Sequence, residues 1–357
     1  DIAIRDNGIV LATHGRSFWI LDDISTIQQL NSKLENDFLL DPAPAYRIKP
    51  NFSEGYIGPM FDSEIGKKYQ LALGTAAMSE KKKNNKGEII TTMLDSGENP
   101  PDGVPIYFYI DKKVDDASIS ITDNNGNTVR DYLTLNNTLK INVGTNRFIW
   151  DMNHNQAVLD EDGSPSGPMA LPGDYNVELK ITKGKKETSL SGSIKLIKDP
   201  RVKASDSDLQ EQIDLLFAIN KKYFELYSNS QVIKINQAEI SEWISRAESN
   251  KNYDVIKKAG DKIIDALNDI ENSLIPSGNN LRAKLTKPIV LGLKLIGLIP
   301  VINSTDFKPT DQSQEVFAEI KDEIDGVLEK LRYFQEVDLI DFQELVEKNN
   351  ISRLNIN

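Results

Sequence analysis

Two stretches near the middle of the chain decide its fold: GTNRFIWD at residues 144–151 and LPGDYNV at residues 171–177. The first contains a predicted strand, Arg147–Asp151, and its Trp150 is large enough to fill a core between two sheets. In the second, Pro172-Gly173 turns the chain into a strand that carries Tyr175. Together they predict a compact antiparallel β-structure with Trp150 at its centre.

The residues on either side of these stretches extend the same pattern. Apolar residues alternate, as at Ile119 and Ile121, and Asp123-Asn124-Asn125-Gly126-Asn127 supplies a hairpin turn. About seven strands in roughly a hundred residues indicate an immunoglobulin-like or fibronectin type III-like β-sandwich, here residues 99–199. The predicted strands are Val104–Ile110, Ala117–Thr122, Thr128–Leu133, Thr138–Val143, Arg147–Asp151, Tyr175–Thr182 and Leu190–Ile197.

Residues 200–357 carry the spacing of amphipathic helices. Ser207 and Gln210 have the form of a capping box, and Pro309-Thr310-Asp311 suits a second helix start. Several such helices joined by short loops predict an antiparallel bundle, although the apolar stripes could also bind partners. Four apolar stripes predict four helices: Leu209, Ile213, Leu216, Phe217, Phe224 and Tyr227; Ile240, Trp243, Ile244 and Ala247; Ile256, Ile263, Leu267, Ile270 and Leu274; and Val316, Ile320, Ile324, Val327, Leu331 and Phe334. We also expect a last short helix at Val337–Val346.

Residues 1–24 predict three short strands, Ile2–Ile4, Ile9–Ala12 and Ser17–Leu21. Three strands with a polar edge cannot bury a core unaided, so they require partner strands. Residues 25–98 form a connecting region. In it we expect a short helix at Ser25–Leu34, strands at Tyr69–Leu73 and Ile89–Met93, and a solvated loop tip at the basic run 81–87.

Composition narrows the classes of function. A chain of 357 residues is longer than a single hydrophobic core usually serves, so we expect two or three domains. A mean hydropathy of −0.40 fits a soluble protein. A net charge of −12 argues against nucleic acid as a partner, and the absence of cysteine excludes disulfides and thiolate chemistry.

The apolar run 288–302 is too short to cross a bilayer, so we expect no transmembrane segment. With Asp1 first and no signal-peptide pattern, we expect a piece of a longer chain.

A family resemblance rests on four stretches of sequence. LATHGRSFWILDD at residues 11–23 resembles the closing blade of bacterial sortilin-like β-propellers, the BNR/YVTN-repeat proteins described as glycosyl hydrolase-like, and DPAPAYR at 41–47 resembles their proline-rich exit. Residues 144–151 and 171–177 resemble the Ig-like domain of flagellar hook-capping proteins and its equivalent after sortilin-like propellers. The resemblance implies a multidomain β plus α chain: a last blade, a sandwich and a helical tail. It also implies that the remainder of the propeller is missing and that the protein is secreted, periplasmic or at the cell surface.

Candidate site residues are few. His14 could act as a base or ligand and Arg16 as an anion binder at the propeller rim, or both could simply flank the turn at Gly15. The acidic loops 123–127 and 160–163 lack the ligand spacing of an EF-hand, so turn chemistry explains them better. His14 and His154 are too few for a histidine metal centre. We therefore predict no catalytic residue, metal or cofactor.

Three functions stay open. The first is a non-catalytic C-terminal structural and interaction module of an exported propeller protein, with a protein or glycan partner. The second is part of a glycosyl hydrolase-like enzyme whose active site lies in the missing propeller. The third is a secretion or assembly protein, suggested by the hook-capping resemblance.

Overall fold

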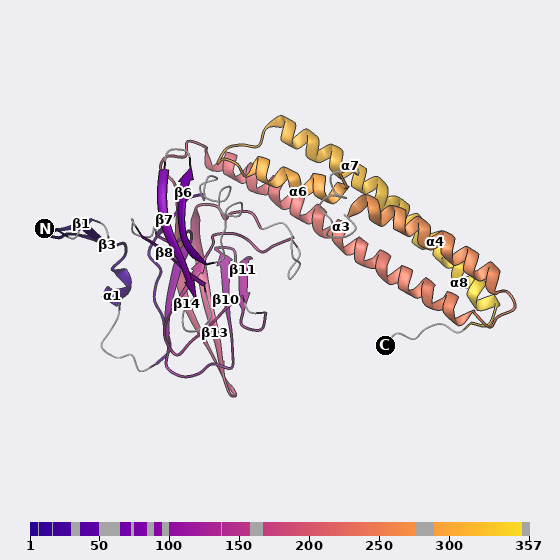
Figure 1. The fold of residues 1–357 in the computed structure, drawn as a ribbon, viewed down its shortest axis with the longest axis horizontal. Coiled ribbons are helices and arrows are strands. Elements are labelled where there is room, and N and C mark those ends of the chain that lie inside the picture. Colours follow the sequence, from indigo (N-terminus) through magenta and orange to yellow (C-terminus); the bar gives the residue numbers. More distant parts are fainter. Residues whose placement is uncertain are drawn as a thin grey trace. The chain divides into compact units, whose positions relative to one another are not determined.

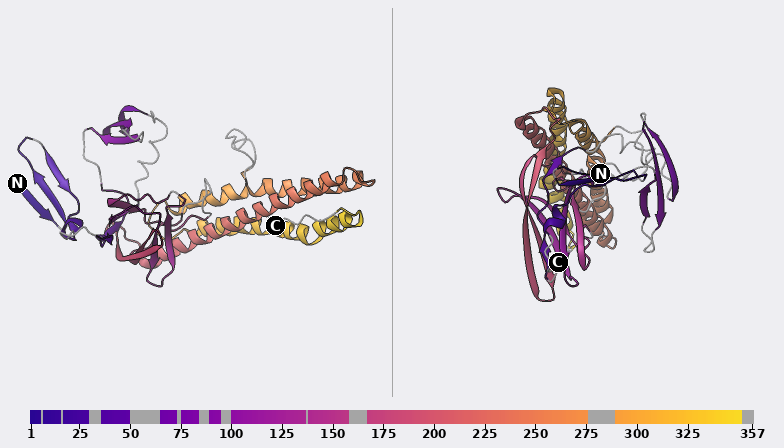
Figure 2. Two further views of the ribbon diagram at one scale, coloured as in Figure 1. Left: turned by 90° about the horizontal axis from the view of Figure 1, so that it is seen from below. Right: turned by 90° about the vertical axis from the view of Figure 1, so that its left-hand side faces the viewer.

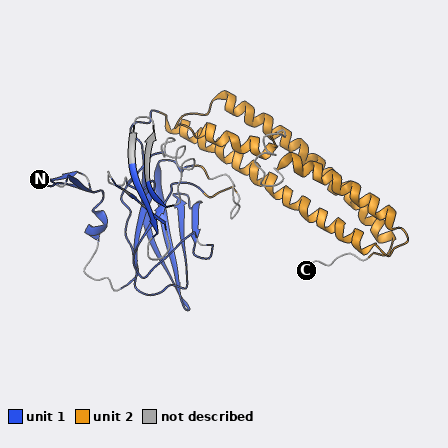
Figure 3. Ribbon diagram, in the orientation of Figure 1, with its two compact units in different colours: residues 1–154, 169–203 blue, residues 155–168, 204–357 orange. Residues whose placement is uncertain are grey.

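The computed structural model describes residues 1–5, 7–15, 17–29, 36–49, 65–72, 75–83, 89–94, 100–136, 138–157, 167–275 and 289–351. The architecture is mixed β and α, in two compact units (Figure 3). The unit of residues 1–154 and 169–203 holds strands β1–β14, and the described helices from Asp206 onward lie in the unit of residues 155–168 and 204–357. Among the described helices, none combines the length and the apolar character needed to span a membrane.

The N-terminal sheet consists of β1 (Ile2–Arg5), β2 (Gly8–Ala12) and β3 (Phe18–Leu21), antiparallel in the order β1-β2-β3 (Figure 1). These confirm the three predicted strands. The predicted helix after them is α1 (Ser25–Gln29), while residues 30–35 lie outside the described part. The Asp23 carboxylate accepts hydrogen bonds from the Ser25 N–H and hydroxyl at 2.8 and 2.9 Å, which starts α1.

Two sheets share one apolar core, and we call them together the two-sheet module. One sheet has the order β11-β10-β13-β14-β5 and the other β12-β9-β4. Their long strands are β9 (Val104–Ile110), β10 (Asp116–Asp123), β11 (Thr128–Leu133), β12 (Gly144–Trp150), β13 (Gly173–Lys183) and β14 (Lys186–Lys198). Alternate residues of β9, β10 and β13 point into the core, where Trp150 is fully buried.

The two short strands β4 (Phe38–Leu39) and β5 (Ala45–Arg47) come from the connecting region and complete the sheets. β4 pairs antiparallel with β9, and β5 pairs parallel with β14. The sequence pattern did not predict either strand, because two or three residues are too few to show a period.

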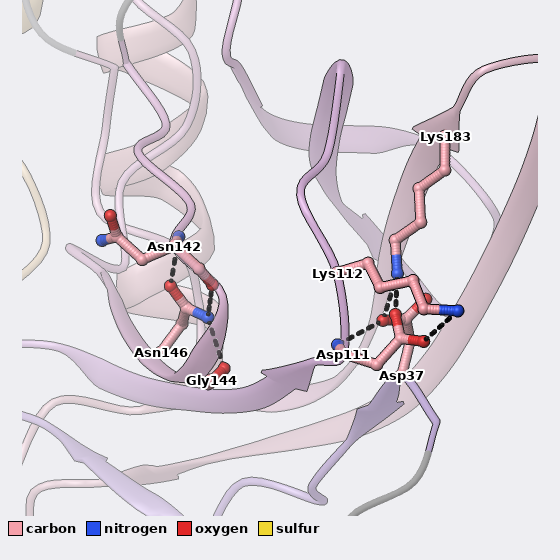
Figure 4. A network of polar contacts seen from close by, with 7 residues as sticks. All are labelled: Asp37, Asp111, Lys112, Asn142, Gly144, Asn146 and Lys183. Carbon is pink, nitrogen blue, oxygen red and sulfur yellow. Dashed lines mark hydrogen bonds and ion pairs between the residues drawn. The ribbon is translucent and has the colours of Figure 1, made fainter.

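The strand predicted at Thr138–Val143 is wrong. At the end of this segment a side chain satisfies the backbone instead: the Asn142 N–H donates to the Asn146 amide oxygen at 2.8 Å, and the Asn146 amide nitrogen donates to the carbonyls of Asn142 and Gly144 (Figure 4). Leu139 still reaches the core. An amide side chain thus competes with a β ladder for the same backbone groups.

A separate sheet contains β6 (Gly66–Ala72), β7 (Thr75–Lys83) and β8 (Ile89–Met93). β6 and β8 confirm two predicted strands. The loop tip predicted for the basic run is wrong at Lys81–Lys83, which lie in β7, the central strand of this sheet. Residues 84–87 lie outside the described part.

The helical unit begins with α3 (Asp206–Arg246), a single helix where the sequence predicted two. The predicted capping box is also wrong: the N-cap is Ser205, whose hydroxyl accepts from the Asp208 N–H while the Asp208 carboxylate accepts from the Ser205 N–H. Phe217 and Phe224 are exposed rather than buried. Asp at the third helical position closes this capping box, a role that Glu or Gln more often plays.

The remaining helices are α4 (Tyr253–Leu274), α6 (Leu291–Ile302), α7 (Asp311–Tyr333) and α8 (Leu339–Lys348). α3 lies beside α4, α6 and α7 around one apolar core (Figure 2). Thr310 caps α7, as predicted, although Val316 on that helix is exposed. A π-helical turn, η2 (Phe334–Asp338), joins α7 to α8 without a break.

Candidate functional site

The N-terminal sheet carries apolar side chains on both faces. Residues directly opposite one another share a face, and the registers join Ile4, Ile9 and Leu21 on one face, with Ile2, Leu11 and Trp19 beside them. The same registers place Ala3, Val10 and Ile20 on the other face, with Ala12 and Phe18. An antiparallel sheet with one wet face would alternate apolar and polar residues, so this pattern requires cover on both faces.

The large side chains of this sheet are exposed. Ile4 is 67 % exposed and Trp19 is 62 % exposed on one face, and Phe18 is 71 % exposed on the other. Contiguous apolar surface of this kind marks a binding surface rather than an ordinary solvated face. We call the two faces of β1–β3 the candidate interaction surface.

The predicted rim residues lie at the turn between β2 and β3. His14 is exposed, and Arg16 lies outside the described residues. Gly15 has a φ of +79°, and the N–H and hydroxyl of Thr13 donate to the Ser17 carbonyl at 3.2 and 2.9 Å. The turn geometry therefore accounts for Gly15, and the roles of His14 and Arg16 stay predictions.

A polar cluster that the sequence did not predict lies where β11 meets the end of β12. The Arg130 guanidinium sits 5.1 Å from the Tyr132 ring centre and donates to the His154 carbonyl at 2.9 Å. The Tyr132 hydroxyl donates to the Asp151 carboxylate at 3.3 Å, and Arg130 lies 4.0 Å from that carboxylate. These bonds tie β11 to the residues after β12.

The pKa values of this cluster argue against acid–base chemistry at neutral pH. Burial lowers the pKa of His154 to about 4, against the opposing charge of Asp123. Burial, together with Asp151, raises the pKa of Tyr132. At pH 7 the imidazole is therefore neutral and a weak base, and the phenol stays protonated.

A second polar cluster joins residues far apart in sequence (Figure 4). Lys183 Nζ donates to both carboxylate oxygens of Asp37, at 2.6 and 2.7 Å, and contacts Asp111. Asp37 also lines a cavity of about 550 Å³ with Gln28, Gln29, Asn36 and residues 38–40. Gln29, which lines this cavity, already exchanges hydrogen bonds with the Asp41 backbone. The polar groups here therefore link segments of the chain to one another.

The acidic turn at 123–127 fits turn chemistry. The Asp123 carboxylate accepts from the N–H groups of Asn125 and Asn127 at 2.8 Å and from the Asn127 amide at 2.9 Å. These bonds, led by that amide, lower the Asp123 pKa. Residues 160–163 lie outside the described part, and within that part no group of three or more His, Asp or Glu side chains could hold a metal ion.

No protein-family model matches this chain, and no curated protein matches its sequence. Function must therefore be argued from the geometry of the candidate interaction surface and the two polar clusters.

Proposed function

We propose that this chain is a non-catalytic structural and interaction module of an exported, sortilin-like propeller protein. In this proposal β1–β3 belong to the closing blade, residues 99–199 form an Ig-like sandwich, and residues 200–357 form a helical bundle. The remainder of the propeller is the first partner, and a protein or glycan ligand is the second.

One observation carries the proposal: the candidate interaction surface is apolar and exposed on both faces of a three-stranded sheet. A propeller blade is a small antiparallel sheet with a neighbouring blade against each face. A blade separated from its neighbours would expose apolar side chains on both sides, and β1–β3 do so.

Two contacts support the Ig-like assignment. The fully buried Trp150 packs edge-on against Tyr175, with ring centres 5.4 Å apart. The Tyr175 hydroxyl donates to the Leu171 carbonyl at 2.7 Å. A core tryptophan and a tyrosine bonded to the backbone a few residues upstream both recur in Ig-like sandwiches.

Mass spectrometry of the intact native polypeptide, with peptide mapping, tests the proposal. We expect a mass well above 40.0 kDa and blade-like repeats on the N-terminal side of residue 1. In that polypeptide, acrylamide should quench Trp19 less than in the isolated chain, because neighbouring blades cover it. A native mass near 40.0 kDa, or equal quenching, would contradict the proposal.

The exposed His14 favours one alternative, a glycosyl hydrolase-like enzyme whose active site lies in the propeller. An accessible imidazole on the β2–β3 turn could contribute to such a site. His14→Ala and Arg16→Ala in the native-length protein should then lower glycan hydrolysis. Unchanged hydrolysis in both variants would remove this chain from the chemistry.

A further inference from the structure

Residues 36–47, which we call the strap, pair with both sheets of the two-sheet module. In β4, Phe38 lies opposite Tyr109 of β9; in β5, Tyr46 lies opposite Ile197 of β14. Both pairings occupy a sheet edge. Adding a short extended segment to a sheet edge is how many domains bind peptides, and the strap does so on two sheets at once.

Side chains of the strap also pack into the module. Phe38 stacks on Tyr109 with ring centres 5.5 Å apart, and the N–H of the buried Leu40 donates to the Tyr107 carbonyl at 2.9 Å. At the far end, the buried Arg47 donates from Nε to the Ala170 carbonyl at 2.7 Å. Between the two strands, Pro42 and Pro44 restrict the backbone, which reduces the entropy lost when the strap docks.

β14 is shaped to receive the strap. A Cβ added to Gly192 would lie 3.2 Å from Leu39 Cδ2 and 3.4 Å from the Asp41 carboxylate. A larger residue there would push against the strap, so the glycine allows its close approach.

An ionic contact fixes where the strap begins. The Asp37 carboxylate accepts both hydrogen bonds from Lys183 Nζ and a third from the Asp111 N–H at 3.0 Å (Figure 4). The side chains of Asp37 and Lys183 are only 13 % and 22 % exposed. Charge-assisted bonds that are shielded from water are stronger than surface ion pairs.

We propose that the strap is a non-covalent joint: the two-sheet module binds residues 36–47 as it would an extended peptide. The chain between strap and β9 includes β6–β8, which hydrogen-bond into a sheet of their own. In this proposal the strap contacts hold residues 1–47 to the module without help from the covalent link through residues 48–103. This inference stands whether or not β1–β3 belong to a propeller.

The test replaces residues 95–99 of the full chain with a protease site and follows residues 1–94 after cleavage. Because the chain has no cysteine, Lys67→Cys on the exposed side of β6 accepts a single fluorophore, and its anisotropy falls when the fragment leaves. We expect the cut protein to stay together in size-exclusion chromatography. Excess synthetic peptide of residues 36–47 should displace the labelled fragment.

Variants then separate the ionic contact from the strand pairing. Lys183→Met and Asp37→Asn should each speed release at least about tenfold, and Gly192→Val should speed it by crowding Leu39. Lys112→Met is the matched control, because Lys112 is 82 % exposed and lies 3.9 Å from Asp111; its release should match the unmodified chain. Circular dichroism of the uncut variants checks that each one folds.

Three results would contradict the proposal that the module binds the strap as it would an extended peptide. They are separation of the unmodified fragments on cutting, no displacement by the peptide, and release from folded Lys183→Met at the unmodified rate.

Discussion

The N-terminal sheet and the two-sheet module use the same kinds of residue with opposite results. Trp150 of the module is 0 % exposed, whereas Trp19 of the N-terminal sheet is 62 % exposed. Both tryptophans lie on antiparallel strands that also carry one Phe and one Ile. The difference is that the module has a second sheet to pack against. Burial is therefore a property of the arrangement, because apolar side chains on a strand need a facing layer to be buried.

The largest expected effect comes from removing Trp150, with removal of Trp19 as the comparison. Trp150→Ala should destabilise the module by about 3–5 kcal/mol, because it leaves a cavity in the core. Trp19→Ala should change the stability of this chain by less than about 0.5 kcal/mol. Hydrogen exchange of the β10 and β13 amides measures the module alone, and equal losses in the two variants would break the contrast.

Glycine substitutions should also destabilise the two-sheet module more than the N-terminal sheet. Gly103 has a φ of +137°, and an added Cβ would lie 2.3 Å from the Trp150 carbonyl oxygen, so Gly103→Ala should cost about 3 kcal/mol. Gly15 has a φ of +79° with open space around it, so Gly15→Ala should cost about 1 kcal/mol. Urea unfolding midpoints measure the stability of the two variants. A smaller loss of stability for Gly103→Ala than for Gly15→Ala would contradict the close approach of Gly103 to the Trp150 carbonyl.

A pH series tests the half-buried His154 of the module. Its pKa in the folded chain, about 4, lies below the ordinary 6.5, so the folded state binds fewer protons and stability falls as the pH drops from 6.5 towards 4. Between pH 7 and pH 5 the unmodified chain should lose about 2 kcal/mol more than His154→Asn. Parallel curves for His154→Asn and the unmodified chain would show that the surroundings of His154 do not lower its pKa.

The smallest expected effect concerns the candidate interaction surface itself. Ile4→Lys and Ile20→Lys each place a charge on one of its faces and should lower binding of a hydrophobic dye roughly twofold, with stability unchanged. Leu135→Lys, at an isolated exposed position of the module, should leave dye binding unchanged. If dye binding fell equally in the Ile4, Ile20 and Leu135 variants, the candidate interaction surface would bind the dye no better than a single exposed apolar residue.

Sequence patterns predicted the long strands well because their core-facing residues alternate. Val104–Ile110 and Thr128–Leu133 have the predicted bounds. The failures arose where a side chain or a distant partner decides the structure. Asn146 satisfies the Asn142 backbone within the segment that was predicted to pair at Thr138–Val143. Lys81–Lys83 join a strand because β8 pairs with all three and β6 with Lys81.

The candidate sites were harder to predict for the same reason. The Asp37–Lys183 contact spans 146 residues, and no local pattern relates its partners. The exposure of Trp19 was implied by the requirement for partner strands, yet the apolar character of both faces followed only from the register. His14 was visible as a residue type, but its exposure had to come from the structure.

The π-helical turn between α7 and α8 has a consequence for helix phase. Inward-facing residues run Leu331, Phe334, Leu339, Phe342 and Val346, and the step of five from Phe334 to Leu339 exceeds the three or four of an α-helix. The wide turn absorbs one surplus residue there, so α8 keeps its apolar side inward. An in-frame loss of one codon between Gln335 and Asp338 would restore ordinary helical phase without rotating α8 out of the core. The chain can thus lose a single residue at this point while the helices on either side stay in step.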